Sequence, residues 1–351
     1  MKPTRSPFAI GSVTLAFLLA LPAVALGQSR VGTTAGTFLT LGAGARQNAL
    51  GQASTAYVTG ADALFWNPGA APLDVSGRTR GGVMFSNHEM FAGIGVYALG
   101  LTIPVSAGVV GFSVTSVDYG RMDVTSEDQP EGTGESFAPS DLAVGLTYAQ
   151  PLTDAFYIGG TAKYVGQRIR DMRAQTVAFD LGFVLVTNYL NGSRLAASIS
   201  NFGGKMRYEG VNGRVFVDTD PDNTGNNPSI PANLQTDRWD LPLSFRLGVA
   251  VPAFKTANAE LLLLSDVQQS NDFDLNADIG AQARYVFGAV AASGRIGYRD
   301  LGPAASSVDT HLSYGGGIEY DLRSLRFGLD FAFVPHDYLG LTRTVDFRLS
   351  F

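Results

Sequence analysis

The feature that most constrains this chain is an alternation of apolar and polar side chains with a period of two residues. Between Phe273 and Tyr285 every odd position is apolar, and most even positions are Asp, Asn, Gln or Arg. The segments 325–333 and 345–351 repeat the pattern, with Phe, Leu or Val on one face and Arg or Asp on the other. Because successive side chains of a strand point to opposite faces, such segments form a sheet with one apolar and one polar face.

Followed along the chain, the pattern predicts about fourteen strands. They begin near Gly81, Gly93, Ala107, Asp141, Ala155, Ala174, Arg194, Leu243, Ala257, Asp272, Ala289, Thr310, Leu325 and Arg343. The connections between them are alternately short and long, and the long ones are Asp118–Ser140, Phe202–Pro242, Arg299–Asp309 and Pro335–Thr342. Outer-membrane barrels have short periplasmic turns and longer extracellular loops, and their even strand number places both termini in the periplasm.

The composition favours a barrel in lipid over a water-soluble sheet protein. Charged residues make up 16% of the chain, against about 25% in a typical soluble domain, although 45% of the residues are hydrophobic. A soluble sandwich or propeller also alternates, but its outward face is polar. Here the apolar face carries large side chains, and Tyr or Phe often ends a strand, as in an interfacial aromatic girdle. We therefore predict an all-β fold, a transmembrane antiparallel β-barrel of about 14 strands in bacterial outer-membrane lipid.

The first residues have the pattern of a secretory signal peptide. Lys2 and Arg5 precede an apolar stretch from about Phe8 to Leu26, and small residues at 23, 25 and 27 allow cleavage before Leu26 or before Gln28. The alternative is an N-terminal membrane anchor. After this segment no apolar run approaches the roughly 20 residues that a spanning helix needs, so any further membrane crossing requires a closed sheet.

The last strand resembles the terminal signature by which barrel proteins are recognised for outer-membrane insertion. Phe347, Leu349 and Phe351 alternate with polar residues up to the end of the chain. We expect these three side chains to form that insertion signature.

A Gly- and Ala-rich segment before the first strand resembles a known family. It contains FLTLGAGAR at 38–46, ALGQA at 49–53 and DALFWNPG at 62–69. These stretches are similar to the opening motifs of the PorV/PorQ family of outer-membrane proteins, which are distant relatives of the FadL transporters. GESF at 134–137, LPLSFRLG at 241–248 and the tail 333–351 also resemble that family.

The resemblance implies a fourteen-stranded barrel whose N-terminal segment folds inside the lumen as a hatch. Trp66, Asn67, Pro68 and Gly69 are the expected hatch residues, and the last three correspond to the family's NPA motif. Gly69 stands where Ala is usual, which predicts a looser backbone at that point. The predicted domains are a signal peptide at 1–27, a hatch at 28–76 and a barrel at 77–351. The alternative is that the segment only fills the lumen.

Charged residues of both signs fall on the predicted inward face of the strands. This set comprises Lys163, Asp180, Arg246, Asp274, Asp278, Arg284, Arg295, Glu319, Arg326, Asp330, Asp346 and Arg348. Ion pairs across neighbouring strands would brace the barrel interior. The alternative is a polar path that lines a channel.

One predicted loop has the beginning of a calcium-binding pattern. Asp218, Asp220 and Asp222 alternate, and Gly225 follows, as in the first half of an EF-hand loop. The twelfth position is Ser229 rather than Glu, so the pattern is incomplete. We expect at most a weak calcium site at 218–225, a solvated polar turn being the alternative, and no other cofactor.

The sequence offers no route to an enzyme or a nucleic-acid partner. The net charge of −6 argues against binding a phosphate backbone, and Cys is absent. Three histidines, His88, His311 and His336, do not cluster, and no nucleophile elbow, phosphate-binding loop or zinc-protease motif is present.

Two functions remain open. The PorV branch of the resemblance implies a role in protein secretion and surface attachment, with type IX-like secreted substrates or secretion-system subunits as partners. The FadL relationship implies a transport channel for hydrophobic small molecules, gated by the hatch. The family resemblance favours the first, and it is a fold-level analogy.

Overall fold

The computed structural model describes residues 32–73, 81–220, 222, 227, 229–301, 311–322 and 324–351. The predicted signal peptide lies outside these residues. In the described part of the chain, no helix has the length and apolar character needed to span a membrane.

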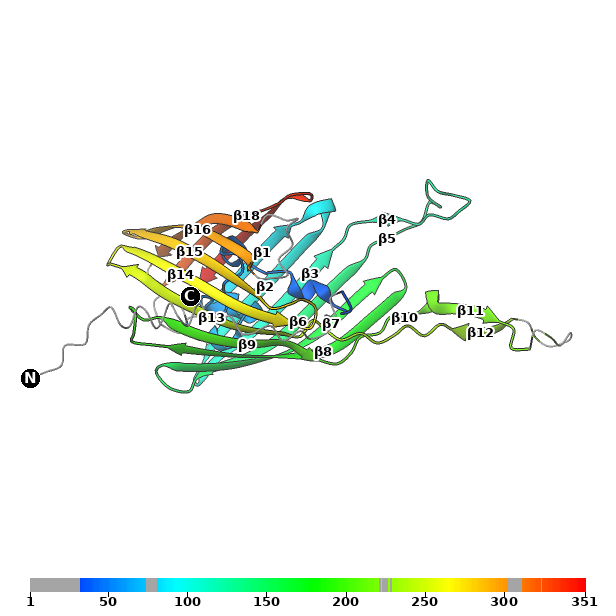
Figure 1. Ribbon diagram of the computed structural model, residues 1–351, viewed down its shortest axis with the longest axis horizontal. Helices are drawn as coiled ribbons and strands as arrows, with labels where there is room; N and C mark the ends of the chain where they lie inside the picture. Colours follow the sequence, from blue (N-terminus) through cyan, green and yellow to red (C-terminus); the bar gives the residue numbers. More distant parts are fainter. Residues whose placement is uncertain are drawn as a thin grey trace, which may run out of the picture.

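The barrel is a closed ring of fourteen antiparallel strands (Figure 1). They are β1 (Gly82–Glu89), β2 (Gly95–Val105), β3 (Gly108–Asp118), β6 (Ser140–Pro151), β7 (Phe156–Ile169), β8 (Met172–Val186), β9 (Arg194–Gly203), β13 (Ser244–Lys255), β14 (Ala259–Ser270), β15 (Asn276–Phe287), β16 (Val290–Leu301), β17 (Leu312–Leu322), β18 (Leu325–His336) and β19 (Gly340–Ser350). The ring closes because β1 pairs with β19, and β8 pairs with β9. The predicted fold class is confirmed.

Strand positions agree with the sequence pattern except near two loops. The predicted start at Asp272 is too early, because β15 begins at Asn276. Asp274 therefore lies in an exposed connection and not in the lumen. The predicted long loop Pro335–Thr342 is also wrong, since β18 and β19 pair up to the couple His336 and Gly340 and leave a short turn.

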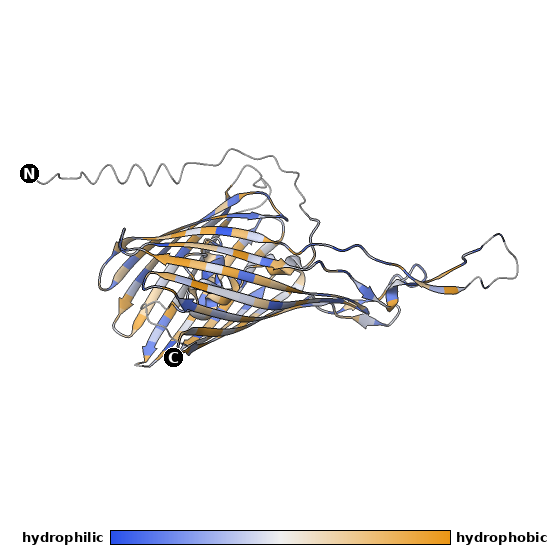
Figure 2. Ribbon diagram, turned by 90° about the horizontal axis from the view of Figure 1, so that it is seen from below, coloured by the Kyte–Doolittle hydropathy of each residue, from blue (hydrophilic) through white to orange (hydrophobic). Residues whose placement is uncertain are grey.

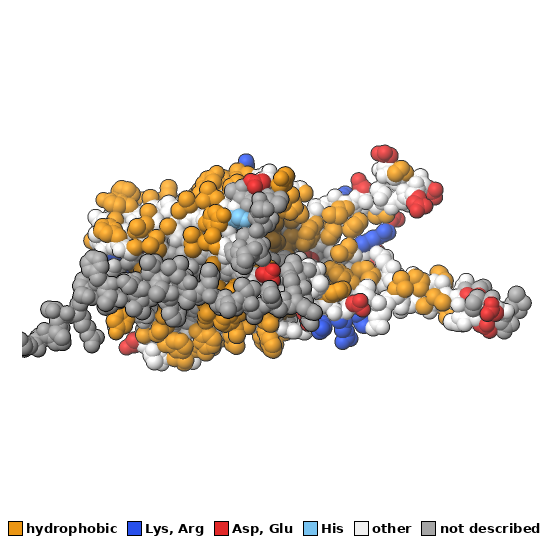
Figure 3. Space-filling model, in the orientation of Figure 1, with side chains coloured by type: hydrophobic (Ala, Val, Ile, Leu, Met, Phe, Trp, Pro, Cys, Tyr) orange, Lys and Arg blue, Asp and Glu red, His pale blue; other side chains and the backbone are white. Residues whose placement is uncertain are grey.

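The two faces of the barrel differ as the alternation predicts. Outward side chains are large and apolar, and Leu146, Phe179 and Ile318 are 63%, 51% and 59% exposed. Inward neighbours such as Asp330 and Asp346 are fully buried. Figure 2 shows apolar and polar residues alternating along the strands, and Figure 3 shows hydrophobic side chains over most of the visible barrel wall.

The two ends of the barrel are unequal. At one end, here called the short-turn end, the connections are brief, as at 106–107 and 152–155. At the other, the long-loop end, the connection 119–139 and the described parts of the connection 204–243 extend away from the barrel (Figure 1). These loops carry the strands β4 (Met122–Asp123), β5 (Ser136–Phe137), β10 (Glu209–Gly210), β11 (Arg214–Val217) and β12 (Ile230–Asn233) and the 3₁₀ turn η5 (Val211–Gly213). A further turn, η4 (Phe91–Gly93), joins β1 to β2.

Residues 32–73, here called the inner segment, pass through the lumen. They form η1 (Thr37–Thr40), α2 (Ala45–Ala49), η2 (Gly60–Phe65) and η3 (Pro68–Ala70). The segment begins at the long-loop end, where the Ala35 N–H donates to the Asp240 carbonyl at 2.9 Å. The largest apolar core lies between this segment and the wall. It joins Leu50, Leu64 and Trp66 to buried residues of six strands, among them Val109 of β3 and Val184 of β8.

The two terminal strands lie side by side with their free ends at the short-turn end. The Phe351 N–H donates to the Gly81 carbonyl there at 2.9 Å. The first described residues, by contrast, lie at the long-loop end beside Asp240 and Asp272. The outer ends of the two terminal barrel strands thus share one side, and the periplasmic location of both termini stays a prediction.

Candidate functional site in the barrel lumen

Inward glycines of the wall provide the room in which the inner segment lies. A Cβ at Gly280 would be 2.7 Å from the Leu50 carbonyl oxygen, and one at Gly315 would be 2.7 Å from the Ala49 Cβ. Gly297, on the strand between them, contacts the Gly51 backbone even more closely. Three neighbouring strands, β15, β16 and β17, therefore lack side chains where the end of α2 touches the wall. Glycine inside a strand often marks such a close approach of another backbone.

The predicted hatch motif rests on a second pair of glycines. The Pro68 carbonyl oxygen lies 2.5 Å from a Cβ built on Gly159 of β7. A Cβ on Gly69 would lie 2.5 Å from the Gly182 carbonyl oxygen of β8, and its φ is not in the left-handed region. The interpretation of Gly69 as a loosened backbone is therefore replaced by a spatial one: glycine is needed because the wall is too near for a methyl group.

Asn67 joins two parts of the inner segment to the wall. Its amide Nδ2 donates to the Thr55 carbonyl at 3.0 Å and to the Phe183 carbonyl at 3.1 Å. Its Oδ1 accepts the Gly69 N–H at 3.1 Å, which caps η3. An Asn side chain is suited to this position because it donates and accepts at once. Asn67, Thr55 and Gly69 are buried and Phe183 is partly buried, so these bonds replace contacts with water that burial removes.

Trp66 connects the motif to the other half of the inner segment. Its indole Nε1 donates to the Ala43 carbonyl at 2.8 Å. The guanidinium of Arg246, one of the predicted lumen charges, lies 4.7 Å from the centre of the ring. This is a cation–π contact between the wall and the segment.

Two inward carboxylates of the wall accept backbone N–H groups of the inner segment. Asp266 of β14 accepts the N–H groups of Ser54 and Thr55 at 2.9 and 2.8 Å. Asp346 of β19 accepts the Ala45 N–H. Asp266 was missed from the sequence because the run of four leucines at 261–264 hides the alternation before it.

Five of the predicted lumen charges meet in one cluster. The carboxylates of Glu319 and Asp330 lie among four guanidinium groups, which belong to Arg46, Arg284, Arg295 and Arg348. Arg295 and Asp330 are 2.7 Å apart, and Arg284 and Glu319 are 3.0 Å apart. Arg46, from α2 of the inner segment, reaches both acids and was not predicted.

The remaining predicted lumen residues have other partners. Lys163 pairs with Asp180 at 2.8 Å, and its ammonium also donates to Asn201. Asp278 accepts the backbone N–H of Asp300 at 2.9 Å. Arg326 pairs with Asp321 at 2.9 Å, where both lie near the short-turn end. Ion pairs between inward side chains are thus present as the cluster around Glu319 and Asp330 and as the separate pairs of Lys163 with Asp180 and Arg326 with Asp321.

One carboxyl group of the inner segment is buried without full compensation. Burial raises the pKa of Asp62 in η2 to about 6, and the guanidinium of Arg46 opposes that rise. Its Oδ1 atom is buried and has no hydrogen-bond partner. Protonation of Asp62 therefore changes the charge inside the lumen in the weakly acidic range.

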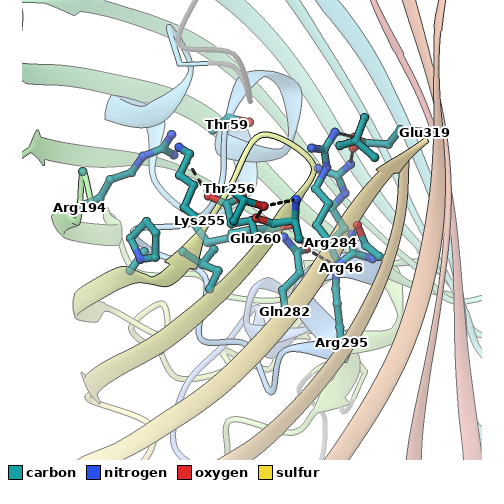
Figure 4. Close-up of a pocket in the computed structure, with 18 of the residues that line it drawn as sticks. Arg46, Thr59, Arg194, Lys255, Thr256, Glu260, Gln282, Arg284, Arg295 and Glu319 are labelled. Carbon is teal, nitrogen blue, oxygen red and sulfur yellow. Dashed lines mark hydrogen bonds and ion pairs between the residues drawn. The ribbon is translucent and has the colours of Figure 1, made fainter. Parts of the chain in front are cut away.

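Cavities lie on both sides of the inner segment. One, of about 80 Å³, is lined by Phe38, Trp66 and Lys163 and faces the long-loop side. Two others open toward the short-turn end, one of about 230 Å³ (Figure 4) and one of about 50 Å³, and Arg46 lines both. The inner segment therefore divides the lumen into compartments.

Two groups of predicted residues lie away from the lumen contacts. Phe347 points outward and is 47% exposed, and Phe351 follows the end of β19, so the insertion signature stays a prediction. Asp218, Asp220 and Asp222 lie in the loop between β11 and β12, parts of which lie outside the described residues. Within the described residues no group of three acidic or His side chains is arranged to hold a metal ion, and the calcium site remains a prediction.

Comparison with known proteins reveals structural likeness without sequence likeness. No family model and no curated protein sequence matches the chain. The CymD monoaromatic hydrocarbon channel is similar with a TM-score of 0.54 and 10% identity, over 88% of this chain and 97% of that one. The Pseudomonas putida toluene transporter TodX gives 0.55 and 12% over 88% and 97%. The Ralstonia pickettii toluene transporter TbuX gives 0.53 and 12% over the same shares. These likenesses establish a shared fold.

Proposed function

We propose that the protein is a channel of the bacterial outer membrane for hydrophobic small molecules, with residues 32–73 as its hatch. The apolar outer wall supports the membrane location, because an exposed band of large hydrophobic side chains needs lipid rather than water. The solved structures of similar fold include proteins described as a monoaromatic hydrocarbon channel and as toluene transporters. Small neutral aromatic molecules are therefore the first substrate class to test.

The observation that carries this proposal is the position of the inner segment across the lumen. It separates a compartment on the long-loop side from two on the short-turn side. Passage through the lumen requires this segment to shift. Its wall contacts are glycine surfaces, side-chain hydrogen bonds, the ion pairs of Arg46 and apolar packing, and none of them is a strand pairing of the barrel sheet.

A reversible lock tests the proposal. The chain has no cysteine, and a Cβ on Gly100 of β2 would lie 3.5 Å from the Cβ of Ala61 in the inner segment. That separation is within the range for a disulfide. We expect a Gly100→Cys, Ala61→Cys variant to take up radiolabelled toluene when reduced and to lose most uptake when oxidised.

The control is the single variant Ala61→Cys treated with the same oxidant. If cells that carry the reduced double variant take up toluene no faster than cells without the protein, the proposed channel function is wrong. If the oxidised double variant transports as fast as the reduced one, the protein transports without movement of the hatch.

The other functions have weaker support. The secretion role depends on the sequence resemblance to PorV/PorQ alone, with no family model or curated sequence behind it. The similar folds named above are channels and transporters rather than enzymes. Transport is therefore preferred over both secretion and catalysis.

A further inference from the structure

The cavity at the short-turn end has an unusual charge. Five basic side chains line its volume of about 230 Å³: Arg46, Arg194, Lys255, Arg284 and Arg295 (Figure 4). Only two acidic residues, Glu260 and Glu319, line it with them. The whole chain has a net charge of −6, so this excess of positive charge is local.

The acidic side chains described around the cavity, Glu260, Glu319 and Asp330 with Asp62 beside Arg46, are fewer than its basic ones. Glu319 is shared by Arg46 and Arg284, and Arg348 lies 3.8 Å from it as well. Asp330, behind the cavity, is likewise shared between Arg46, Arg295 and Arg348. Cations held together in a partly dehydrated space attract a counter-ion, and guanidinium groups suit carboxylate or phosphate.

The rest of the lining indicates that the ion has a carbon skeleton. Ala250, Leu262 and Val286 form an apolar part of the cavity wall, and Ala56 and Tyr57 of the inner segment adjoin it. The Tyr57 hydroxyl already donates to Gln282 at 2.7 Å, so the ring is held in place. An inorganic ion would leave the apolar part facing water.

We propose that this cavity binds a small organic anion, with its carboxylate among the basic side chains and its carbon atoms against the apolar wall. The site lies beneath the inner segment, and Arg46, Tyr57 and Thr59 of that segment contribute to its lining. A bound anion would contact both the segment and the wall. This proposal does not require that the protein transports toluene.

Two lysines provide a matched pair of variants. Lys255 lines the cavity, has a side chain 57% exposed, and pairs with Glu260 at 3.7 Å. Lys205, at the long-loop end, has a side chain 54% exposed and pairs with Asp240 at 3.2 Å. Lys255→Gln and Lys205→Gln remove the same charge from equally accessible positions, and only the first is in the proposed site.

The test is calorimetric titration of benzoate into the full-length barrel in a neutral detergent at low salt, where screening is weak. Benzyl alcohol serves as the uncharged probe and inorganic phosphate as the inorganic one. Unheated and boiled samples on a gel check that each variant remains folded. We expect saturable benzoate binding, weakened at least threefold by Lys255→Gln and unchanged by Lys205→Gln, with no saturable binding of benzyl alcohol.

The absence of saturable benzoate binding would overturn the proposal. So would an equal loss of affinity in the two lysine variants, because the effect would then come from overall charge. Tighter binding of phosphate than of benzoate would show that the site takes an inorganic ion and would refute the organic assignment.

Discussion

The contact between Gly182 and the Asn67-Pro68-Gly69 motif predicts that one added methyl group will loosen the inner segment. In Gly182→Ala the new Cβ would lie 2.8 Å from the Gly69 nitrogen and 2.8 Å from the Pro68 Cδ, and closer still to the Asn67 Oδ1. None of these atoms belongs to a long flexible side chain. Overpacking of this kind costs roughly 1–3 kcal/mol. A cost of about 2 kcal/mol would raise the population of the displaced segment about thirtyfold, since about 1.4 kcal/mol corresponds to tenfold.

Cysteine labelling measures that population directly, because the native chain has no Cys. Ala56 is 2% exposed in the inner segment, so Ala56→Cys reports displacement through its rate of reaction with a maleimide. The matched control is Gly294→Ala in β16, where a Cβ would meet nothing within 4 Å. An unchanged labelling rate in Gly182→Ala, or an equal increase in Gly294→Ala, would refute the reasoning.

Three further predictions concern other contacts. Asp266→Asn should raise the labelling rate roughly tenfold, because the loss of charged hydrogen bonds to two N–H groups costs about 1–3 kcal/mol; unchanged labelling would show that they do not hold the segment. Asp62 ionises near pH 3.8 when released but near 6 when buried, so the segment loses stability as pH rises from about 4 to above 6. Labelling should therefore rise over that range, and Asp62→Asn should flatten the profile; an identical profile in both would contradict the burial effect. Leu146→Arg should reduce the free energy of unfolding of the barrel in lipid by about 2–4 kcal/mol if the residue lies at mid-membrane, as measured by urea titration. Tyr189→Arg, in an exposed turn, should leave that free energy unchanged.

The barrel could be predicted because its two faces are written into the sequence with a period of two. A wall with lipid on one side and a filled lumen on the other needs opposite chemistry at consecutive residues, as at Phe327-Gly328-Leu329-Asp330. The alternation is lost where an inward position carries a glycine or an apolar residue instead of a polar side chain. The predicted strand start at Asp272 was too early because the residues of the connection before β15 continue the alternation.

The lumen contacts could be predicted only in part, because they join residues far apart in the sequence. Most of the inward charges were identified, though Asp266 was missed. Their arrangement about Glu319 and Asp330 was not predicted, because it depends on Arg46 entering from the inner segment. The glycines under that segment are a usable signal that was overlooked. Gly280, Gly297 and Gly315 occupy inward positions on consecutive strands, which is the pattern expected where another backbone lies against a wall.

The charge arrangement supports the proposal that the inner segment moves, because it would let the segment leave without destroying the cluster in the lumen. Arg46 is the segment's contribution to the cluster, while Arg284, Arg295 and Arg348 come from the wall together with both acids. If Arg46 withdraws, Glu319 and Asp330 keep guanidinium partners from the wall, so neither of these two carboxylates is left unpaired, which is the costly outcome. A wall that needed Arg46 for neutrality would hold the segment permanently. The wall has more arginines in the cluster than acids, and this favours a segment that moves. It predicts that Arg46→Gln raises the labelling rate of Ala56→Cys, while unheated and boiled samples on a gel show that the barrel remains folded.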